Sequence, residues 1–185
     1  ICRFIYSTMG KYVRTLSKCG LWGVDILIFV SVGTQDIPFD RLLKSVENQI
    51  ELGNIKEKVI VQAGVTNFKS DKMEIVSFIP MDEFKKIIKE SKIIICHGGV
   101  GTITDGLRNG KIVIACPRLA KYGEHINDHQ LQIINNFGDA GFIISLLDPK
   151  DLDKALKKAK TFKPKMYKSN TKNMIQLLED FIDKN

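Results

Sequence analysis

The sequence lacks several features that would assign it to common protein classes. No apolar run approaches the roughly 20 residues that a membrane-spanning helix needs, and the longest run, near residues 26–30, has the length of a strand. The 4 cysteines include no C-x-x-C pair, so neither a zinc ribbon nor a disulfide framework is indicated. We therefore expect a protein of the reducing cytoplasm that requires no metal and no other cofactor.

Two common phosphate-binding signatures are also missing. No Gly-Lys-Ser or Gly-Lys-Thr follows a glycine turn, which argues against an NTPase. The G-x-G-x-x-G dinucleotide fingerprint fails, because Gly99-x-Gly101 is followed by Thr104 in place of the third glycine. The apolar run at residues 112–116 ends in Pro117, whereas NAD enzymes have an acidic residue there to hold the ribose. An NAD-dependent oxidoreductase is therefore disfavoured, although it stays open as an alternative.

Positive charge is unevenly distributed along the chain. The formal net charge is +7, and residues 150–185 alone carry ten basic and five acidic residues. A nucleic-acid-binding surface more typically interleaves basic and aromatic residues around a groove. We therefore expect no nucleic-acid partner, and interpret the terminal lysines either as a solvated face or as a contact with an anionic membrane or an acidic partner.

Apolar, strand-length runs alternate with segments of helical periodicity from residue 27 onward. The predicted strands are residues 27–32, 59–63, 74–78, 92–96, 112–115 and 141–144. The predicted helices are residues 39–52, 82–90, 99–109, 127–137, 149–160 and 172–182. Near-continuous apolar strands separated by helices indicate a parallel sheet covered on both faces. We predict a single Rossmann-like α/β domain over residues 27–165, which binds ligands outside the carboxyl ends of its strands.

The most distinctive segment is a glycine-rich turn between a predicted strand and a predicted helix. Its residues are Cys96-His97-Gly98-Gly99-Val100-Gly101-Thr102. Glycines permit close approach of the backbone to a ligand, and the free N–H groups of a helix start favour a phosphate or diphosphate. Asp105, about one turn later, has two interpretations that stay open: it binds the vicinal hydroxyls of a ribose, or it only complements the helix dipole.

Four short motifs of this chain resemble one known family. The motifs are Phe29-Val30-Ser31-Val32-Gly33-Thr34-Gln35, then Phe39-Asp40-Arg41-Leu42, then His97-Gly98-Gly99-Val100-Gly101-Thr102, and Asp128-His129-Gln130 at the end of a long aperiodic loop. They resemble the donor-binding, C-terminal half of GT-B glycosyltransferases of the murein N-acetylglucosaminyltransferase type. The similarity is greatest to the small soluble subunit of two-component transferases of dolichol-linked glycan and bacterial exopolysaccharide or capsule synthesis.

The resemblance implies a UDP-sugar site at the strand ends. The backbone around Phe78 and Ile79 is expected to read uracil. Asp105 stands where the family usually has a glutamate that binds the ribose hydroxyls. The diphosphate is expected at the glycine turn and helix start, formed by His97, Gly98, Gly99, Gly101 and Thr102.

The donor sugar is assigned to two further segments by the same resemblance. Asp128 and Gln130 occupy the positions that hold sugar hydroxyls, and Gly33 and Thr34 line the cleft close to the phosphates. Each has a plainer interpretation. Gly33 and Thr34 are then only a tight strand exit, Asp128 a residue of the first turn of the next helix, and Gln130 a solvated surface residue.

The resemblance also implies an inverting, UDP-sugar-dependent hexosyltransferase. Arg118 and Lys121 are candidate cations for the leaving UDP, but the chain offers no convincing general base for the acceptor. His97 is tempting, yet a histidine before a glycine turn more often holds the loop by hydrogen bonding. We therefore expect the base from a partner, and leave the catalytic residue unknown. His125, Asp128 and His129 match no zinc signature, so we expect no metal.

These expectations combine into a donor-binding catalytic subunit that is active only with a membrane-associated, acceptor-binding partner. The acceptor would be a polyprenyl-linked glycan, and the partner would recruit the cytoplasmic chain to the cytoplasmic face of the membrane. We predict that residues 166–185, with their terminal helix, dock the partner. Residues 1–26 match the family poorly, and we favour a translated upstream region or a remnant over a genuine helical addition. Alternative functions are a non-catalytic enhancer subunit or a UDP-sugar epimerase.

Overall fold

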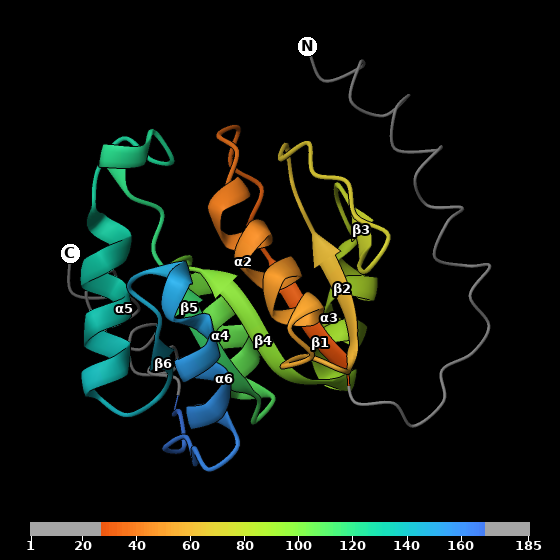
Figure 1. The fold of residues 1–185 in the computed structure, drawn as a ribbon. Helices are drawn as coiled ribbons and strands as arrows, with labels where there is room; N and C mark the ends of the chain where they lie inside the picture. The colour runs from red at the N-terminus through yellow and green to blue at the C-terminus, as the bar shows by residue number, and fades with distance from the viewer. Residues whose placement is uncertain (1–26, 169–185) are drawn as a thin grey trace.

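A computed structural model describes residues 27–168 of the 185-residue chain (Figure 1). Its strands are β1 (Leu27–Ser31), β2 (Lys58–Gln62), β3 (Glu74–Val76), β4 (Ser91–His97), β5 (Ile112–Cys116) and β6 (Ile144–Ser145). Its α-helices are α2 (Asp40–Glu51), α3 (Met81–Glu90), α4 (Val100–Arg108), α5 (His129–Asp139) and α6 (Leu152–Ala159), with 3-10 turns η2 (Ala120–Tyr122) and η3 (Pro149–Asp151). The predicted helix 172–182 and residues 1–26 lie outside the described part of the chain.

All six strands form one parallel sheet in the order β3-β2-β1-β4-β5-β6. This is the Rossmann order, in which the chain moves outward from β1 on one side and then returns to start the other half at β4. The predicted fold class is therefore confirmed. Because β1 and β4 are neighbours from which the two halves diverge, their carboxyl ends define the place where such folds bind ligands.

The two faces of the sheet are buried by different helices (Figure 1). Alternate strand residues such as Ile28 and Val30 pack with α2 and α6, whereas Phe29 and Ile94 pack with α3, α4 and α5. This alternation follows from the two-residue side-chain period of a strand. Cys96 and Cys116 are buried free thiols, as expected for cysteines at the ends of core strands.

Several predicted boundaries are wrong by two or three residues: the strand expected at residues 74–78 ends at Val76, and the helix expected from residue 149 begins at Leu152 after a 3-10 turn. Two further differences have a local cause. The helix expected from residue 127 begins at His129, because Asp128 has non-helical dihedral angles and lies at the N-cap. The strand expected at residues 141–144 is reduced to Ile144–Ser145, because Gly141 adopts a positive φ of 76° that ends the preceding helical segment and is incompatible with extended backbone. Both differences lie away from the core strands that set the topology.

Candidate functional site

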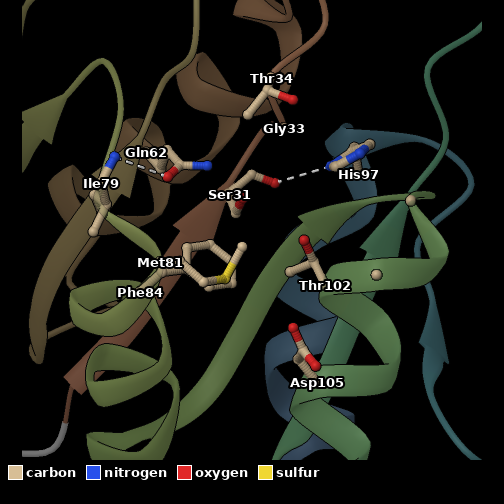
Figure 2. A pocket seen from close by; sticks show the side chains of 12 residues that line it. Ser31, Gly33, Thr34, Gln62, Ile79, Met81, Phe84, His97, Thr102 and Asp105 are labelled. Atoms are coloured by element: carbon tan, nitrogen blue, oxygen red, sulfur yellow. Dashed lines mark hydrogen bonds between the residues drawn. The ribbon is translucent and has the colours of Figure 1, made fainter. Parts of the chain in front are cut away.

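A pocket of about 310 Å³ opens at the carboxyl ends of β1 and β4 (Figure 2). Its volume is at the lower end of the range for small-molecule sites. Side chains and backbone from three regions line it: the exit of β1, the glycine turn with α4, and the segment from the end of β2 to α3. The structure thus brings together eight of the twelve site residues predicted from the sequence: Gly33, Thr34, Ile79, His97, Gly99, Gly101, Thr102 and Asp105.

His97 is clamped between two of these glycines. A Cβ on Gly33, whose φ is +85°, would lie 2.6 Å from His97 Cε1, and a Cβ on Gly99 would also collide with the ring. Nδ1 of His97 lies 3.4 Å from the carbonyl oxygen of Ser31. Burial lowers the pKa of His97 to about 4, so the ring is neutral at pH 7. A group so weakly basic suits a loop-holding role better than general-base catalysis at neutral pH.

The start of α4 forms one side of the pocket. Its N-cap is Gly99, and no side chain caps the first turn, so the free N–H groups of that turn remain available to an anion. A Cβ on Gly101 would meet nothing within 4 Å. None of the described lining residues is lysine or arginine. An anion bound here would therefore be held by the helix start rather than by cationic side chains.

Asp105 supplies the only carboxylate among the described lining residues. It lies beyond the first turn of α4, where the helix dipole has little effect on a charged side chain. Figure 2 shows its carboxylate below Thr102 on the α4 side of the pocket. This placement argues against the dipole interpretation, and Asp105 Oδ1 lies 3.9 Å from Nη1 of Arg108. Ribose binding by Asp105 stays a prediction.

The opposite side of the pocket contains residues that the sequence analysis did not select. They are Ser31, Gln62, Met81 and Phe84. Gln62 Oε1 accepts a hydrogen bond from the backbone N–H of Ile79 at 3.1 Å. The signal that could have revealed Ser31 and Gln62 is a polar residue closing an otherwise apolar strand, because such positions meet at the ligand-binding edge of a parallel sheet.

Four predicted residues do not line the pocket. Phe78 lies next to the lining residue Ile79 and is 44% exposed. Gly98 lies beneath the turn and donates its N–H to Gln130 Oε1 at 3.1 Å. Gln130 is only 7% exposed, so its interpretation as a solvated surface residue is wrong. Asp128 Oδ1 accepts from the Ala120 N–H at 2.9 Å, and sugar binding by Asp128 and Gln130 stays a prediction.

Arg118 does not face the pocket, so its prediction as a cation for the leaving group is wrong. Its side chain is 1% exposed. The guanidinium donates to the carbonyl oxygens of Val32 at 2.8 Å and Ile37 at 2.6 Å. Lys121 is exposed, with Nζ 4.9 Å from the centre of the Tyr122 ring, and it is absent from the described lining as well.

A family match accounts for this combination of fold and pocket. Residues 27–184 match the family described as the glycosyltransferase family 28 C-terminal domain. The chain belongs to this family. The predicted resemblance to the C-terminal half of GT-B glycosyltransferases is thereby confirmed.

Solved structures share the fold of this family 28 domain. An NMR structure of ALG13 is 21% identical with a TM-score of 0.54, and the match covers 83% of this chain and 94% of ALG13. MurG from Acinetobacter baumannii is 15% identical with a TM-score of 0.54, covering 84% and 50% of the two chains. The glycosyltransferase VinC, solved with dTDP, is 17% identical with a TM-score of 0.51, covering 75% and 35%.

The chain therefore spans half of MurG and about a third of VinC, but nearly all of ALG13. No curated protein matches it. No helix among residues 27–168 is long and apolar enough to cross a membrane. Within the same range no cluster of three or more His, Cys, Asp or Glu side chains is placed to hold a metal ion.

Proposed function

We propose that this chain is the donor-binding catalytic subunit of a two-component inverting glycosyltransferase. It binds a UDP-sugar, and a membrane-associated partner binds a polyprenyl-linked glycan acceptor. The observation that carries the proposal is the pocket at the β1/β4 switch point. There an uncapped helix start without cationic side chains faces the same space as the carboxylate of Asp105.

The chemistry of this pocket fits a nucleoside diphosphate ester. When the bond to the sugar breaks, negative charge grows on the diphosphate, and the N–H groups at the start of α4 are fixed in place to stabilise it. Asp105 offers two oxygens to the two hydroxyls of a ribose. Met81 and Phe84 provide apolar surface at the other side for a planar base. Each part of a UDP moiety therefore has a matching group.

The pocket supplies a donor site, and the proposal assigns the acceptor site to a partner. A GT-B transferase binds its acceptor with a second domain, and this chain corresponds to half or less of MurG and VinC but to 94% of ALG13. Within the described residues, His97 is the only histidine that lines the pocket, and its low pKa makes it a poor base. The partner is therefore assigned both the acceptor site and the general base.

Calorimetric titration of the purified chain tests the donor site. We expect UDP to bind and NADH not to bind. Asp105→Ala is expected to weaken UDP by about 10-fold or more, because hydrogen bonds to a charged group contribute about 1.5–3 kcal/mol each. The same change should weaken dTDP less, since a deoxyribose offers only one of the two hydroxyls. Asp153→Ala, in the first turn of α6 and away from the pocket, is the matched control.

Co-expression with the membrane partner separates the alternatives. Transfer of the sugar to a polyprenyl-linked acceptor, lost in Asp105→Ala, is the expected result. UDP binding without transfer by the complex would favour a non-catalytic enhancer. NADH binding in place of UDP would overturn the proposal. Transfer is expected to survive excess EDTA, because the N–H groups at the start of α4 would stabilise the leaving diphosphate without a metal ion.

A further inference from the structure

Gln62 occupies a position that fixes the orientation of its amide group. It is the last residue of β2 and is 5% exposed. Because the backbone N–H of Ile79 is always a donor, the atom it contacts at 3.1 Å must be the Oε1 acceptor of Gln62. The Nε2 amide is therefore the end turned away from Ile79, toward Ser31 and the interior of the pocket (Figure 2).

This amide has hydrogen-bonding capacity that the protein does not use. Within residues 27–168 no partner accepts from Gln62 Nε2. Ser31, the register partner of Gln62 on β1, has a buried hydroxyl that also lacks a hydrogen-bond partner. The Ser31 hydroxyl is thus a buried polar group without a partner, which is rare in native proteins. Gln62 Nε2 has no acceptor in the described protein and is open to the pocket, where an acceptor atom of a ligand can meet it.

Gln62 lies on the side of the pocket opposite Asp105 (Figure 2). Gln62 ends β2, on one side of β1, whereas Asp105 lies on α4, which follows β4 on the other side of β1. If Asp105 holds the ribose, the base extends away from it across the pocket toward Gln62. The ring atom of a pyrimidine farthest from its ribose bond is C4, so the substituent at C4 reaches Gln62 first.

We propose that Gln62 selects the nucleobase of the donor by donating a hydrogen bond from Nε2 to the C4 carbonyl oxygen of uracil. This inference rests on the proposed function and names a specificity residue for the same site. Uracil has an oxygen at C4, whereas cytosine has an amino group that can only donate. A fixed donor at Gln62 therefore accepts uracil and rejects cytosine, because two opposed donors leave a buried group unpaired.

The Ile79 contact makes this discrimination rigid. With its oxygen held by the Ile79 N–H, the Gln62 amide cannot turn over to offer an acceptor to cytosine without losing that hydrogen bond. The backbone at Ile79, which was expected from the sequence to read uracil, then also contributes to base selection by holding the Gln62 side chain in place. Met81 and Phe84, which line the same side of the pocket, offer apolar surface to the base.

The test compares UDP with CDP by titration of the full chain at pH 8, where a glutamate is ionised. Gln62→Glu keeps an acceptor for the Ile79 N–H but presents an acceptor to the base. We expect its ratio of CDP to UDP affinity to rise at least 10-fold over wild type. Gln62→Met, which is neutral and cannot donate, should bind the two nucleotides about equally. The added charge can weaken both ligands of the glutamate variant, so the ratio is the readout.

Gln49→Glu is the matched control. Gln49 is also buried, accepts from Asn54 Nδ2 at 2.8 Å and lies on α2, outside the described lining of the pocket. We expect it to keep the wild-type ratio. Folded Gln62 variants that keep the wild-type ratio, or a wild type that binds UDP without preferring it to CDP, would overturn the role of Gln62 and leave the donor site standing. A wild type that binds neither nucleotide overturns the proposed function itself.

Discussion

Two loops leave neighbouring strands at the same edge of the sheet and use their residues differently. The glycine turn at residues 97–102 follows β4, has no lysine, arginine or carboxylate, and opens onto the pocket. The loop at residues 117–128 follows β5 and carries several charged side chains, yet none of them lines the pocket. The charged side chains of the loop at residues 117–128 instead stabilise the protein's own structure.

The charged loop is held by hydrogen bonds within the protein. Glu124 accepts two hydrogen bonds from the guanidinium of Arg41, both at 2.9 Å, and one from the Leu119 N–H at 3.1 Å. Arg118 donates to backbone carbonyls of the β1–α2 segment. A polar or charged group near a ligand site therefore indicates a ligand only where it has no hydrogen-bond partner within the protein. The glycine turn meets that condition, because its donors are the uncapped N–H groups at the start of α4.

Arg118→Leu should produce the largest effect of the changes that separate the two loops. It removes four hydrogen bonds to the carbonyls of Val32, Ile37, Pro38 and Glu124, and the bonds to Val32 and Glu124 are buried. We expect the free energy of unfolding to fall by about 3 kcal/mol or more, as for other broken networks around a buried charge. Urea denaturation measures this. Lys121→Met, which removes an exposed cation of the same loop, should change stability by less than about 0.5 kcal/mol.

UDP affinity provides the opposite check on these two variants. At a temperature where Arg118→Leu is folded, neither variant should lose more than about threefold in affinity, since neither side chain faces the pocket; that is well under the tenfold loss that about 1.4 kcal/mol represents. A tenfold loss of UDP affinity in a folded Arg118→Leu protein would show that Arg118 contributes to UDP binding, and the two loops would then not differ in this respect.

The stability of the glycine turn should depend on pH through His97. Burial, assisted by Arg118 and His125, lowers its pKa to about 4 from the usual 6.5. The unfolded chain therefore binds more protons between these values, so stability is complete above pH 6.5 and falls as the pH drops toward 4. The loss attributable to His97 is about 3 kcal/mol by pH 4.

The difference between two proteins isolates this effect from the titration of carboxylates. Urea midpoints measured from pH 7.5 to pH 4 should decline less steeply in His97→Gln than in wild type, even if the variant is less stable at pH 7.5. His129→Gln, an exposed position at the start of α5, should keep the wild-type pH dependence. Parallel curves for wild type and His97→Gln would show that the ring is not buried in the neutral form.

The sequence predicted the glycine turn well because its signal is local. Three glycines within four residues between an apolar strand and a helix leave few structural alternatives, and β4, the turn and α4 all lie where they were predicted. The parallel sheet could be predicted for a similar reason, since core strands such as residues 112–116 are apolar throughout.

The base side of the pocket could not be predicted in this way. The proposed role of Gln62 depends on Ile79, which lies 17 residues away in the segment between β3 and α3. Arg118 misled the prediction for the same reason, because its partners at residues 32, 37 and 38 are 80 or more positions away. A polar residue at a strand end indicates the ligand-binding edge of the sheet. Only its contacts in the folded protein decide whether it binds a ligand or stabilises the structure.

The smallest change that sharpens the comparison is a single methyl group within the glycine turn. On Gly99 it would collide with the ring of His97, whereas on Gly101 it would meet nothing within 4 Å. Gly99→Ala should therefore cost about 1–3 kcal/mol of stability, as overpacking does. Gly101→Ala should be neutral or stabilising by up to about 1 kcal/mol, because alanine is favoured over glycine in a helix.

The stability and the UDP affinity of Gly101→Ala should change in different directions. Gly101 lines the pocket at the first turn of α4, so its open space is the space that a diphosphate would fill. Folded Gly101→Ala protein should lose about tenfold or more in UDP affinity, equivalent to about 1.4 kcal/mol, while its melting temperature stays at or above that of wild type. An alanine that leaves UDP binding intact would mean that the diphosphate lies elsewhere along the edge, and the charged loop would again be a candidate to hold it.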